Sequence, residues 1–456
     1  MPSSSYTDLS ISENRAEALA LQHYGVKGKA TPLPGEVDFN FRLDTAGGHS
    51  YTLKLSRPGA DTGLLEMQTA LLKRLEAAGL PLQLPLPKAN KTGEFITPIL
   101  DEHGQQRHLR LLSWVPGQVF AKASPHSSTL LESLGQACGS LCRALGGFRH
   151  PAAERYFKWD PSRLYWVMEY EHLFKGRQAE LFHYFLGLFE REAQPLLPHL
   201  RKSVNYNDAN DYNVLITENR DGPPAAWSHE VSGFIDFGDA LYTQTINDLA
   251  IALAYALMDK PDPLAAAIPA IRGFHSAFPL QEEEVASLLA LTGARLLISV
   301  TNSAINKQQE PDNEYLLISE QPAWALLEKL RDIPPALAHY TFRHACGWEP
   351  CPQAAAFQEW AHRQNFAPLT TLQLEPGQWR VMDLGVGSPE LGNNDHFNDE
   401  QRFLRHIERM MEDSGVPAGA GGYGEVRPFY TTDAYLQMSN DGPHWRSVHL
   451  GLDIWG

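Results

Sequence analysis

The chain has 456 residues, of which 43% are hydrophobic and 20% are charged, and its formal net charge is -16 at pH 7. A chain of this length and ordinary composition is too long for one hydrophobic core, so we expect a globular protein of two or three domains. The negative charge leaves no basic stripe that could replace the counterions of a polynucleotide, which argues against a nucleic-acid partner.

The compartment is predicted from three features. No apolar run approaches the roughly 20 residues that cross a bilayer, so no membrane partner is expected. The first residues lack the basic and apolar regions of a signal peptide. The four cysteines, Cys138, Cys142, Cys346 and Cys351, are too few for a disulfide framework, so we expect them to be unpaired thiols. Cys346 and Cys351 could alternatively form half of a zinc site. These features favour the cytoplasm.

The first predicted elements are a β-hairpin and a helix. Residues 39–43 and 51–55 alternate apolar and polar positions around a two-glycine turn. In this alternation Lys54 points away from the core, as a phosphate-binding lysine should. A helix with leucines at helical spacing follows over 61–78, and Glu66 near its start is placed to pair with Lys54. We predict that the two residues position nucleotide phosphates, with plain helix capping by Glu66 as the alternative.

Two further nucleotide contacts are predicted in the same region. Asn40 ends the segment 33–40, which takes the place of a phosphate-covering loop although it holds a single glycine. Trp114 lies in the apolar run 111–115, which ends at a Pro-Gly turn and is expected to face an adenine ring. Such a run is equally typical of a plain core strand.

Amphipathic patterns predict helices over 130–145, 177–197 and 280–304. These helices would form a mainly helical lobe around a pocket for the molecule that accepts a phosphoryl group. Each polar or aromatic candidate for that pocket could instead be solvated or cap a helix; the candidates are Trp159, Asp160 and Asn302.

Two segments between these helices carry the predicted chemistry. Asp208 is followed five residues later by Asn213, and Asp236 opens an Asp-Phe-Gly sequence. The apolar runs 214–216 and 233–235 are predicted to pair as a hairpin that brings these side chains together. Asp208 would accept the proton of a hydroxyl group, while Asn213 and Asp236 offer the oxygen ligands that Mg²⁺ prefers. Such residues also dominate ordinary turns, but their order and spacing favour phosphoryl transfer from a metal-bound nucleotide.

The two segments resemble the catalytic and metal-binding loops of the aminoglycoside phosphotransferase and choline kinase-like superfamily. The turn ahead of the first hairpin resembles the hydroxylysine kinase-like branch. The resemblance implies an α+β, bilobal protein-kinase-like fold, with an antiparallel β N-lobe and a mainly helical C-lobe. It also implies ATP and Mg²⁺ as cofactors, Asp208 as the base, and Asn213 and Asp236 as the metal ligands.

The chain departs from the superfamily just ahead of the proposed base. The family usually has His-Gly where this chain has Tyr206-Asn207, so the support of the loop must differ here. Asp248 matches a residue that usually has a structural hydrogen-bonding role in the superfamily. Because of the departure, a catalytically silent nucleotide-binding module is an alternative function.

Past residue 340 the composition changes towards glycine and proline. A helix is predicted over 400–412 and a flexible loop over 416–424. His449 and Asp453 resemble the His-x-x-x-Asp zinc motif of lysostaphin-type metallopeptidases. Catalytic zinc needs three protein ligands, and no third ligand follows, so the motif is expected to be incomplete. The run 380–388 resembles the first strand and glycine turn of a methyltransferase, with too little chain after it for that fold.

The predicted domains are an N-lobe over 1–117, a C-lobe over 118–340, and a linker with an incomplete peptidase-like region over 341–456. This order resembles bacterial fusions of a hydroxylysine kinase-like, a peptidase-like and a class III aminotransferase-like domain, so further domains are expected after residue 456. The fusion implies a small amino alcohol substrate, hydroxylysine-like or ethanolamine-like, with aminoglycosides as another option. A fragment of a zinc peptidase-like protein is the remaining alternative.

Overall fold

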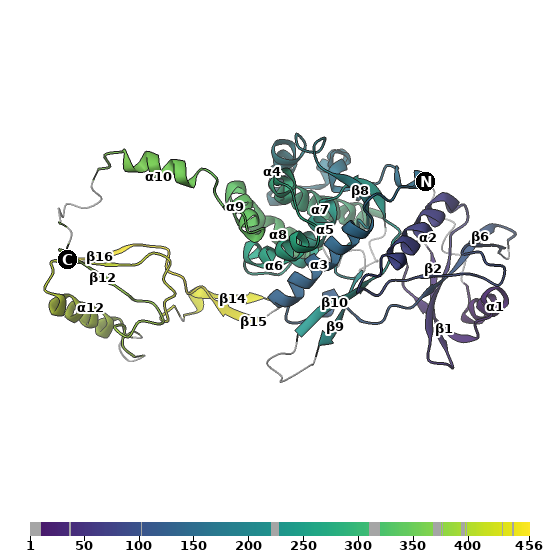
Figure 1. Ribbon diagram of the computed structural model, residues 1–456, viewed down its shortest axis with the longest axis horizontal. Coiled ribbons are helices and arrows are strands. Elements are labelled where there is room, and N and C mark those ends of the chain that lie inside the picture. Colours follow the sequence, from purple (N-terminus) through teal and green to yellow (C-terminus); the bar gives the residue numbers. More distant parts are fainter. Residues whose placement is uncertain are drawn as a thin grey trace. The chain divides into compact units, whose positions relative to one another are not determined.

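The computed structural model describes residues 11–35, 38–101, 103–219, 228–309, 320–367, 375, 377–393, 397, 399–430, 432–439 and 442–456. The chain forms two compact units, Met1–Pro350 and Cys351–Gly456 (Figure 1). Each unit has a hydrophobic core of its own.

The larger unit begins with an antiparallel sheet. Its described strands are ordered β1-β2-β3-β6-β4, and β5 pairs with β6. The predicted hairpin is confirmed as β2 and β3, in a register that places Asn40 opposite Lys54 and Phe41 opposite Leu53. The strands are β1 (Gly28–Leu33), β2 (Phe39–Thr45), β3 (Ser50–Leu55), β4 (Pro87–Lys88), β5 (Thr97–Leu100) and β6 (Gln106–Ser113).

The two faces of this sheet differ because successive side chains in a strand point to opposite sides. Phe41 and Leu53 are buried and pack with Leu19 of helix α1 (Glu13–Tyr24). Lys54 and its cross-strand partner Arg110 belong to the other, polar face. Lys54 therefore points away from this core, as predicted.

Helices form most of the rest of the larger unit. The helix α7 contacts α4, α5, α8 and α9. It is long and apolar enough to cross a membrane by length and composition, but 89% of its most apolar window is buried inside the protein. The helices are α2 (Thr62–Ala77), α3 (Ser128–Ala144), α4 (Arg177–Leu188), α5 (Asn247–Ala256), α6 (Pro263–Ala277), α7 (Glu282–Gln309), α8 (Glu320–Arg331) and α9 (Pro335–Ala345).

Two glycines allow α3 and α6 to approach closely. A Cβ atom on Gly135 would lie 1.8 Å from the carbonyl oxygen of Ala270, and one on Gly273 would lie 2.0 Å from that of Glu132. No side chain fits at either position. On its other side, α3 supports strand β10, where Ser133 Oγ accepts a hydrogen bond from a backbone N–H.

The two motif segments lie on one hairpin, as predicted. Strands β9 and β10 are antiparallel, with Val214 opposite Phe234. Asn213 precedes β9, and Asp236 follows β10, so the same end of the hairpin carries both. The backbone N–H of Ile235 donates to the carbonyl oxygen of Asn213 at 3.0 Å. The remaining strands of this unit are β7 (Gln118–Val119), β8 (Lys202–Asn205), β9 (Val214–Asn219), β10 (Ser228–Phe234) and β11 (Leu241–Gln244).

The smaller unit combines a three-stranded sheet with one packed helix. Strands β12 and β13 run parallel, with α12 between them in the sequence, and β16 is antiparallel to β13. Strand β13 lies inside the glycine-rich segment 416–424, so the expected flexible loop is wrong there. The elements are α10 (Ala354–His362), β12 (Trp379–Met382), α12 (Glu400–Ser414), β13 (Ala418–Gly421), β14 (Leu436–Ser439), β15 (Gly442–Trp445) and β16 (Asp453–Trp455).

Candidate active site

Three side chains hold the Asp208 carboxylate in the loop between β8 and β9. Its Oδ1 accepts from Asn210 Nδ2 and from Arg295 Nη2, both at 3.0 Å, and its Oδ2 accepts from Asn213 Nδ2 at 2.6 Å. Burial and the nearby Asp239 carboxylate raise the pKa of Asp208 well above its usual range, whereas the Arg295 cation opposes this shift. A raised pKa makes the carboxylate a better proton acceptor. The side chain keeps 15% of its surface exposed, so a small molecule can reach it.

Asp236 is open to a ligand on one side and paired with a cation on the other. Its φ of 52° lies in the left-handed region, which is strained for a residue with a side chain. The backbone N–H of Gly238 donates to its Oδ1 at 3.1 Å, and Lys54 Nζ lies 3.9 Å from the same oxygen. The Lys54 cation, helped by this N–H, lowers the pKa of Asp236. With 53% of its side chain exposed, Asp236 offers an ionised oxygen ligand.

Asn213 and Asp236 have the chemistry of a magnesium site. Asn213 uses its amide nitrogen on Asp208, which leaves the amide oxygen for a metal ion. No group of three or more His, Cys, Asp or Glu side chains that could hold a metal ion occurs in the described ranges. Mg²⁺ usually takes one or two protein ligands together with phosphates and water. The residues therefore fit a magnesium ion that arrives with a nucleotide.

The predicted ion pair between Lys54 and Glu66 is wrong. Glu66 is exposed, and Lys54 is paired with Asp236 instead. Helix α2 turns Gln68 towards the sheet, where its Oε1 accepts from Arg110 Nη1 at 2.6 Å. Successive helical residues are rotated by about 100°, so Glu66 and Gln68 lie on opposite sides of the helix.

Arg110 is a second cation on the polar face of the sheet that the sequence does not single out. It is buried, lies opposite Lys54 on the neighbouring strand, and has its Nη2 3.6 Å from Asp38 Oδ2. Its Nε has no hydrogen-bond partner among the described protein atoms, and neither has the buried Oδ1 of Asn40. The signal in the sequence is an arginine placed between Leu109 and Leu111 in β6. The polar face thus carries two cations, Lys54 and Arg110, that could attract a phosphate, and the predicted nucleotide contact of Asn40 stays a prediction.

Trp114 follows β6, as expected from its place in the sequence. Its ring is covered by the guanidinium group of Arg42, 4.6 Å from the ring centroid, and its backbone N–H donates to Ser50 at 3.1 Å. The predicted contact with adenine stays a prediction. Residues 36 and 37 of the predicted phosphate-covering loop lie outside the described residues.

Tyr206 and Asp248 support the loop ahead of the base. The Tyr206 hydroxyl donates to the carbonyl oxygen of Ile235, directly before Asp236. Its ring packs on Phe237 with the centroids 4.7 Å apart. The backbone N–H of Tyr206 donates to Asp248 Oδ2 at 3.2 Å, which agrees with the structural role expected of Asp248. The base loop and the metal loop are thus joined through Tyr206.

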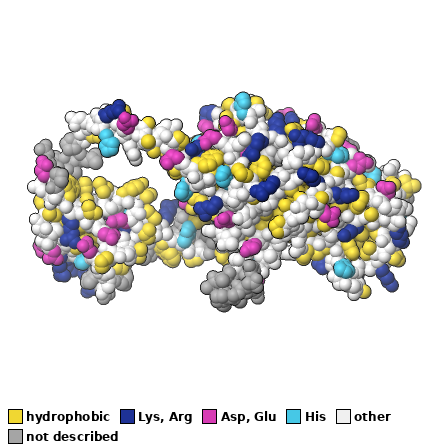
Figure 2. All heavy atoms as spheres, in the orientation of Figure 1, with side chains coloured by type: hydrophobic (Ala, Val, Ile, Leu, Met, Phe, Trp, Pro, Cys, Tyr) yellow, Lys and Arg dark blue, Asp and Glu magenta, His cyan; other side chains and the backbone are white. Residues whose placement is uncertain are grey.

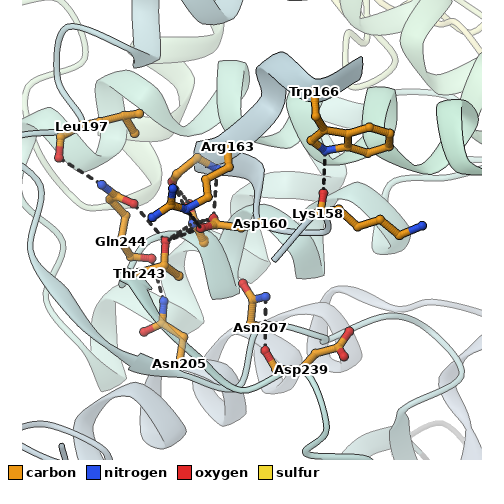
Figure 3. Close-up of polar contacts among 12 residues, drawn as sticks. Lys158, Asp160, Arg163, Trp166, Leu197, Asn205, Asn207, Asp239, Thr243 and Gln244 are labelled. Carbon is orange, nitrogen blue, oxygen red and sulfur yellow. Dashed lines mark hydrogen bonds and ion pairs between the residues drawn. The ribbon is translucent and has the colours of Figure 1, made fainter. Parts of the chain in front are cut away.

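Asn207 fills the place where the family has glycine. Its φ is 64°, a backbone conformation that glycine adopts freely and asparagine adopts more often than other residues. Its backbone N–H donates to Asp248 Oδ1 at 2.6 Å, and its Nδ2 donates to the carbonyl oxygen of Asp239 at 3.4 Å (Figure 3). The side chain therefore adds a contact that a glycine could not make.

Asp160 has a structural role in this lobe, and its predicted contact with a substrate stays a prediction. Its side chain is almost fully buried, and burial raises its pKa. The carboxylate accepts a hydrogen bond from Thr243 Oγ1 at 3.0 Å (Figure 3). It also accepts from Asn247 Nδ2 at 2.9 Å and from the N–H of Ser162 at 3.0 Å. It caps the 3₁₀ helix Pro161–Leu173. These partners account for the burial of the carboxylate.

The other two predicted pocket residues also bind protein groups. Asn302 is buried, accepts from Lys158 Nζ at 2.7 Å and donates to the carbonyl oxygen of Ile298 at 3.1 Å. Trp159 lies against Arg295, whose guanidinium carbon is 4.7 Å from its ring centroid. A substrate contact of Trp159 stays a prediction. The sequence does not single out Arg295, although a lone arginine in the apolar pattern over 280–304 was a usable signal.

In the smaller unit, His449 and Asp453 do lie together. His449 Nε2 is 3.4 Å from Asp453 Oδ2, and its Nδ1 is 2.5 Å from the Tyr430 hydroxyl. The same Asp453 oxygen accepts from Arg427 Nη1 at 2.7 Å. A guanidinium group on a ligand oxygen competes with a zinc ion for it. The pair therefore provides two ligand types of a zinc site, and no third His, Cys, Asp or Glu ligand joins them in the part of the chain that the structure describes.

Comparison with known proteins agrees with this geometry. Residues 29–286 match the model of the phosphotransferase enzyme family. The hydroxylysine kinase of Mus musculus is 30% identical over 341 residues, covering 71% of this chain and 90% of that protein. The hydroxylysine kinase of Bos taurus is 28% identical over 348 residues, covering 73% and 92%.

A solved structure shares the fold. It is described as amicoumacin kinase hAmiN in complex with AMP-PNP, Ca2+ and Ami; it is 16% identical, with a TM-score of 0.51, and the match covers 75% of this chain and 96% of that one. The bilobal protein-kinase-like fold expected from the sequence is confirmed.

Proposed function

Because the chain belongs to the phosphotransferase enzyme family, in its hydroxylysine kinase-like branch, we propose that it transfers the γ-phosphoryl group of ATP to a hydroxyl group of a small amino alcohol. The observation that carries the proposal is the convergence of Asp208, Asn213 and Asp236 at one end of a hairpin, with Lys54 beside them. Most catalysis of phosphoryl transfer consists of such positioning and charge neutralisation.

Each residue has a defined role in the proposed reaction. Asp208 accepts the proton of the acceptor hydroxyl while the hydroxyl oxygen bonds to the γ-phosphorus of ATP. The bond between the γ-phosphorus and the bridging oxygen of the β-phosphate breaks, and ADP leaves. Asn213 orients Asp208 through its amide nitrogen. Asn213 and Asp236 would hold Mg²⁺, which when bound neutralises the phosphate charge. Lys54 and Arg110 bind the phosphates from the sheet.

The charge around the base supports an acceptor that carries an amine. Asp236 and Asp239 act electrostatically on Asp208. Asp211, in the same loop, has a buried Oδ1 without a partner among the described protein atoms, and burial raises its pKa to about 6. An ammonium group would offset these clustered carboxylates. Hydroxylysine-like and ethanolamine-like compounds have this chemistry, and so do aminoglycosides.

A screen for ADP formation tests the proposal. The purified chain is given ATP and Mg²⁺ with 5-hydroxylysine, ethanolamine, 1-amino-2-propanol or an aminoglycoside, and each reaction is repeated with EDTA. We expect turnover with at least one vicinal amino alcohol, loss of turnover with EDTA, and loss in Asp208→Asn with ATP binding retained. Measurable ATP binding with silence across the whole panel would favour the alternative, a catalytically silent nucleotide-binding module.

For the smaller unit we propose a likeness to the start of a lysostaphin-type domain without a working zinc site. The proximity of His449 and Asp453 supports the similarity to the lysostaphin-type zinc motif. The hydrogen bond from Arg427 to Asp453 supports the proposal that this motif does not bind zinc. Metal analysis of the full chain after incubation with zinc should find the same zinc content in wild type and in His449→Ala. A full equivalent of zinc that disappears in His449→Ala would contradict this.

We also propose that the protein works in the cytoplasm. Its four cysteines are free thiols, and three of them are buried. Unpaired thiols persist in reducing compartments. Cell fractionation with an antibody against the chain checks the compartment.

A further inference from the structure

Arg295 is a buried cation in an apolar part of helix α7. Its side chain is 2% exposed, and its neighbours Ala294, Leu296 and Leu297 are buried as well. Removing a guanidinium group from water is unfavourable unless it gains partners of matching geometry. The contacts of Arg295 must therefore explain why a charge is tolerated at this position.

The guanidinium group joins two separate segments of the chain. Nη1 donates to the carbonyl oxygen of Trp159 at 2.8 Å, and Nη2 donates to Asp208 Oδ1 at 3.0 Å. The group also lies over the rings of Trp159 and Tyr255, 4.7 and 5.6 Å from their centroids. A planar guanidinium with both η nitrogens bonded and both rings against it is fixed in one orientation.

The Trp159 end of this connection is itself held firmly. Trp159 precedes Asp160, whose buried carboxylate accepts hydrogen bonds from Thr243 (Figure 3) and from Asn247. The carbonyl oxygen that accepts from Arg295 therefore belongs to a segment with little freedom to move. Asp208 is connected through Arg295 to this buried polar network.

We propose that Arg295 is a positioning residue that holds the Asp208 carboxylate against the helical lobe, in the orientation needed to accept the hydroxyl proton. This inference rests on the proposed function, in which Asp208 is the base. The two other donors to Asp208, Asn210 and Asn213, lie in the same loop and move with it. Arg295 is the described donor that comes from the core of the lobe. Both its η nitrogens are bonded to protein, so it acts through Asp208.

Substitutions at Arg295 test this role. In Arg295→Met we expect kcat to fall about 100-fold with the KM for ATP unchanged, because a misdirected base slows the chemical step and spares nucleotide binding. Arg295→Lys keeps the charge, but one ammonium group cannot replace the planar fork that reaches both oxygens, so a loss of about 10-fold is expected. In Arg295→Ala, low millimolar guanidinium should restore part of kcat in a saturable way, whereas urea should not.

A second arginine of the same lobe provides the control. Arg201 makes an ion pair with Glu284 of helix α7 at 2.8 and 2.5 Å, and its other described side-chain contacts are with Pro279 and Phe278, away from Asp208. Arg201→Met should lower the melting temperature and leave kcat unchanged. An equal loss of kcat in Arg201→Met and Arg295→Met, an unchanged kcat in Arg295→Met, or the absence of guanidinium rescue would overturn the inference.

The contact can also be tested without turnover. Melting temperatures of Arg295→Met, Asp208→Asn and the double variant form a double-mutant cycle. If the two residues are coupled, the shift of the double variant differs from the sum of the single shifts, and additive shifts would overturn the inference. If the wild type shows no turnover with any acceptor, the proposed function is contradicted. The double-mutant cycle would still show whether Arg295 and Asp208 are energetically coupled.

Discussion

At the residue scale, the chain replaces a missing histidine with a hydrogen bond between two loops. Tyr206 donates to the carbonyl oxygen of Ile235 and packs between the rings of Phe234 and Phe237. The base loop and the metal loop therefore share one side chain. This arrangement holds Asp208 close to the proposed metal ligands without the histidine that the family usually has.

Removing the Tyr206 hydroxyl should slow the reaction without unfolding the protein. In Tyr206→Phe we expect kcat to fall about 5-fold, because the lost hydrogen bond corresponds to about 1 kcal/mol and the metal loop loses its connection to the base loop. Steady-state kinetics at saturating ATP measure this. Tyr212→Phe, in the same loop and without a hydroxyl contact in the described structure, is the matched control and should keep full kcat. Equal losses in the two variants would show that the hydroxyl contact has no special role.

Asp248 should give the protein a pH-dependent stability. Burial raises its pKa to about 6, although two backbone N–H groups favour its ionised form. In the unfolded chain the pKa is about 3.9, so the folded state binds the proton more tightly. The stability that this provides is complete below about pH 4 and is lost as the pH rises through about 6.

Denaturant unfolding at several pH values measures this effect. Between pH 4 and 6.5 the free energy of unfolding of the wild type should fall by about 2 kcal/mol more than that of Asp248→Asn, which cannot titrate at this position. Asp211 and Asp160 remain in both proteins, so their titration cancels in the comparison. Parallel curves for the two proteins would contradict the expected pKa.

At the element scale, the sequence predicts those parts of the fold that have local signals. The hairpin of β2 and β3 follows from alternation, and α2, α3 and α7 follow from helical spacing. Helix α1 was missed although Ser12 caps its start and Gly25 ends it in the left-handed conformation. Its hydrophobic pattern is weak because only Ala16, Leu19 and Ala20 are buried. Strand β13 was missed because its small residues resemble a loop.

The residues of the candidate site also differ in whether the sequence contains a local signal for them. Asp208, Asn213 and Asp236 were predicted because their spacing along the chain encodes the hairpin. Arg295 lies 87 residues from Asp208, and the two meet only after α7 packs on the lobe. In α2, Gln68 lies three residues from Leu65 and from Leu71 and therefore shares the leucine face, whereas Glu66 lies on the opposite side; the leucine spacing thus favoured Gln68 over Glu66 as the residue that faces the sheet. Contacts set by tertiary packing have no local signal.

The close packing of α3 on α6 should be sensitive to a single methyl group. In Gly135→Ala the added Cβ would lie 1.8 Å from the backbone oxygen of Ala270 in α6. This clash is unfavourable because backbone atoms cannot shift without disturbing the helix. We expect the free energy of unfolding to fall by about 1 to 3 kcal/mol or more. Since α3 also supports β10, kcat should fall at temperatures near the melting point.

A helical glycine elsewhere provides the control for this substitution. At Gly187 in α4 the nearest neighbour of an added Cβ is the end of the flexible Arg191 side chain, at 3.1 Å. Gly187→Ala should be neutral or stabilising, because alanine has the higher helix propensity. Thermal and denaturant unfolding of both variants compare the two sites. A neutral Gly135→Ala would contradict the close approach.

At the scale of the whole molecule, the two units differ in how well they bury apolar surface. The larger unit has an extensive core that includes both lobes. The smaller unit buries few apolar side chains, and Figure 2 shows hydrophobic side chains at its surface. Its most exposed hydrophobic residues include Val381, Val386, Tyr423, Met438 and Leu450. A unit with so small a core is expected to be the less stable of the two.

Removing the smaller unit should therefore leave the catalytic part intact. Every residue assigned to phosphoryl transfer lies in residues 1–350, together with the cores that hold them. We expect the full chain to unfold in two thermal transitions and a chain ending at Pro350 to lack the lower one, because the units have separate cores. Calorimetry of both chains measures this.

Acceptor-dependent ADP formation should be the same for both chains within error, and the full chain with His449→Ala and Asp453→Ala should match them. A shortened chain that binds ATP but has lost turnover would show that the smaller unit contributes to the site.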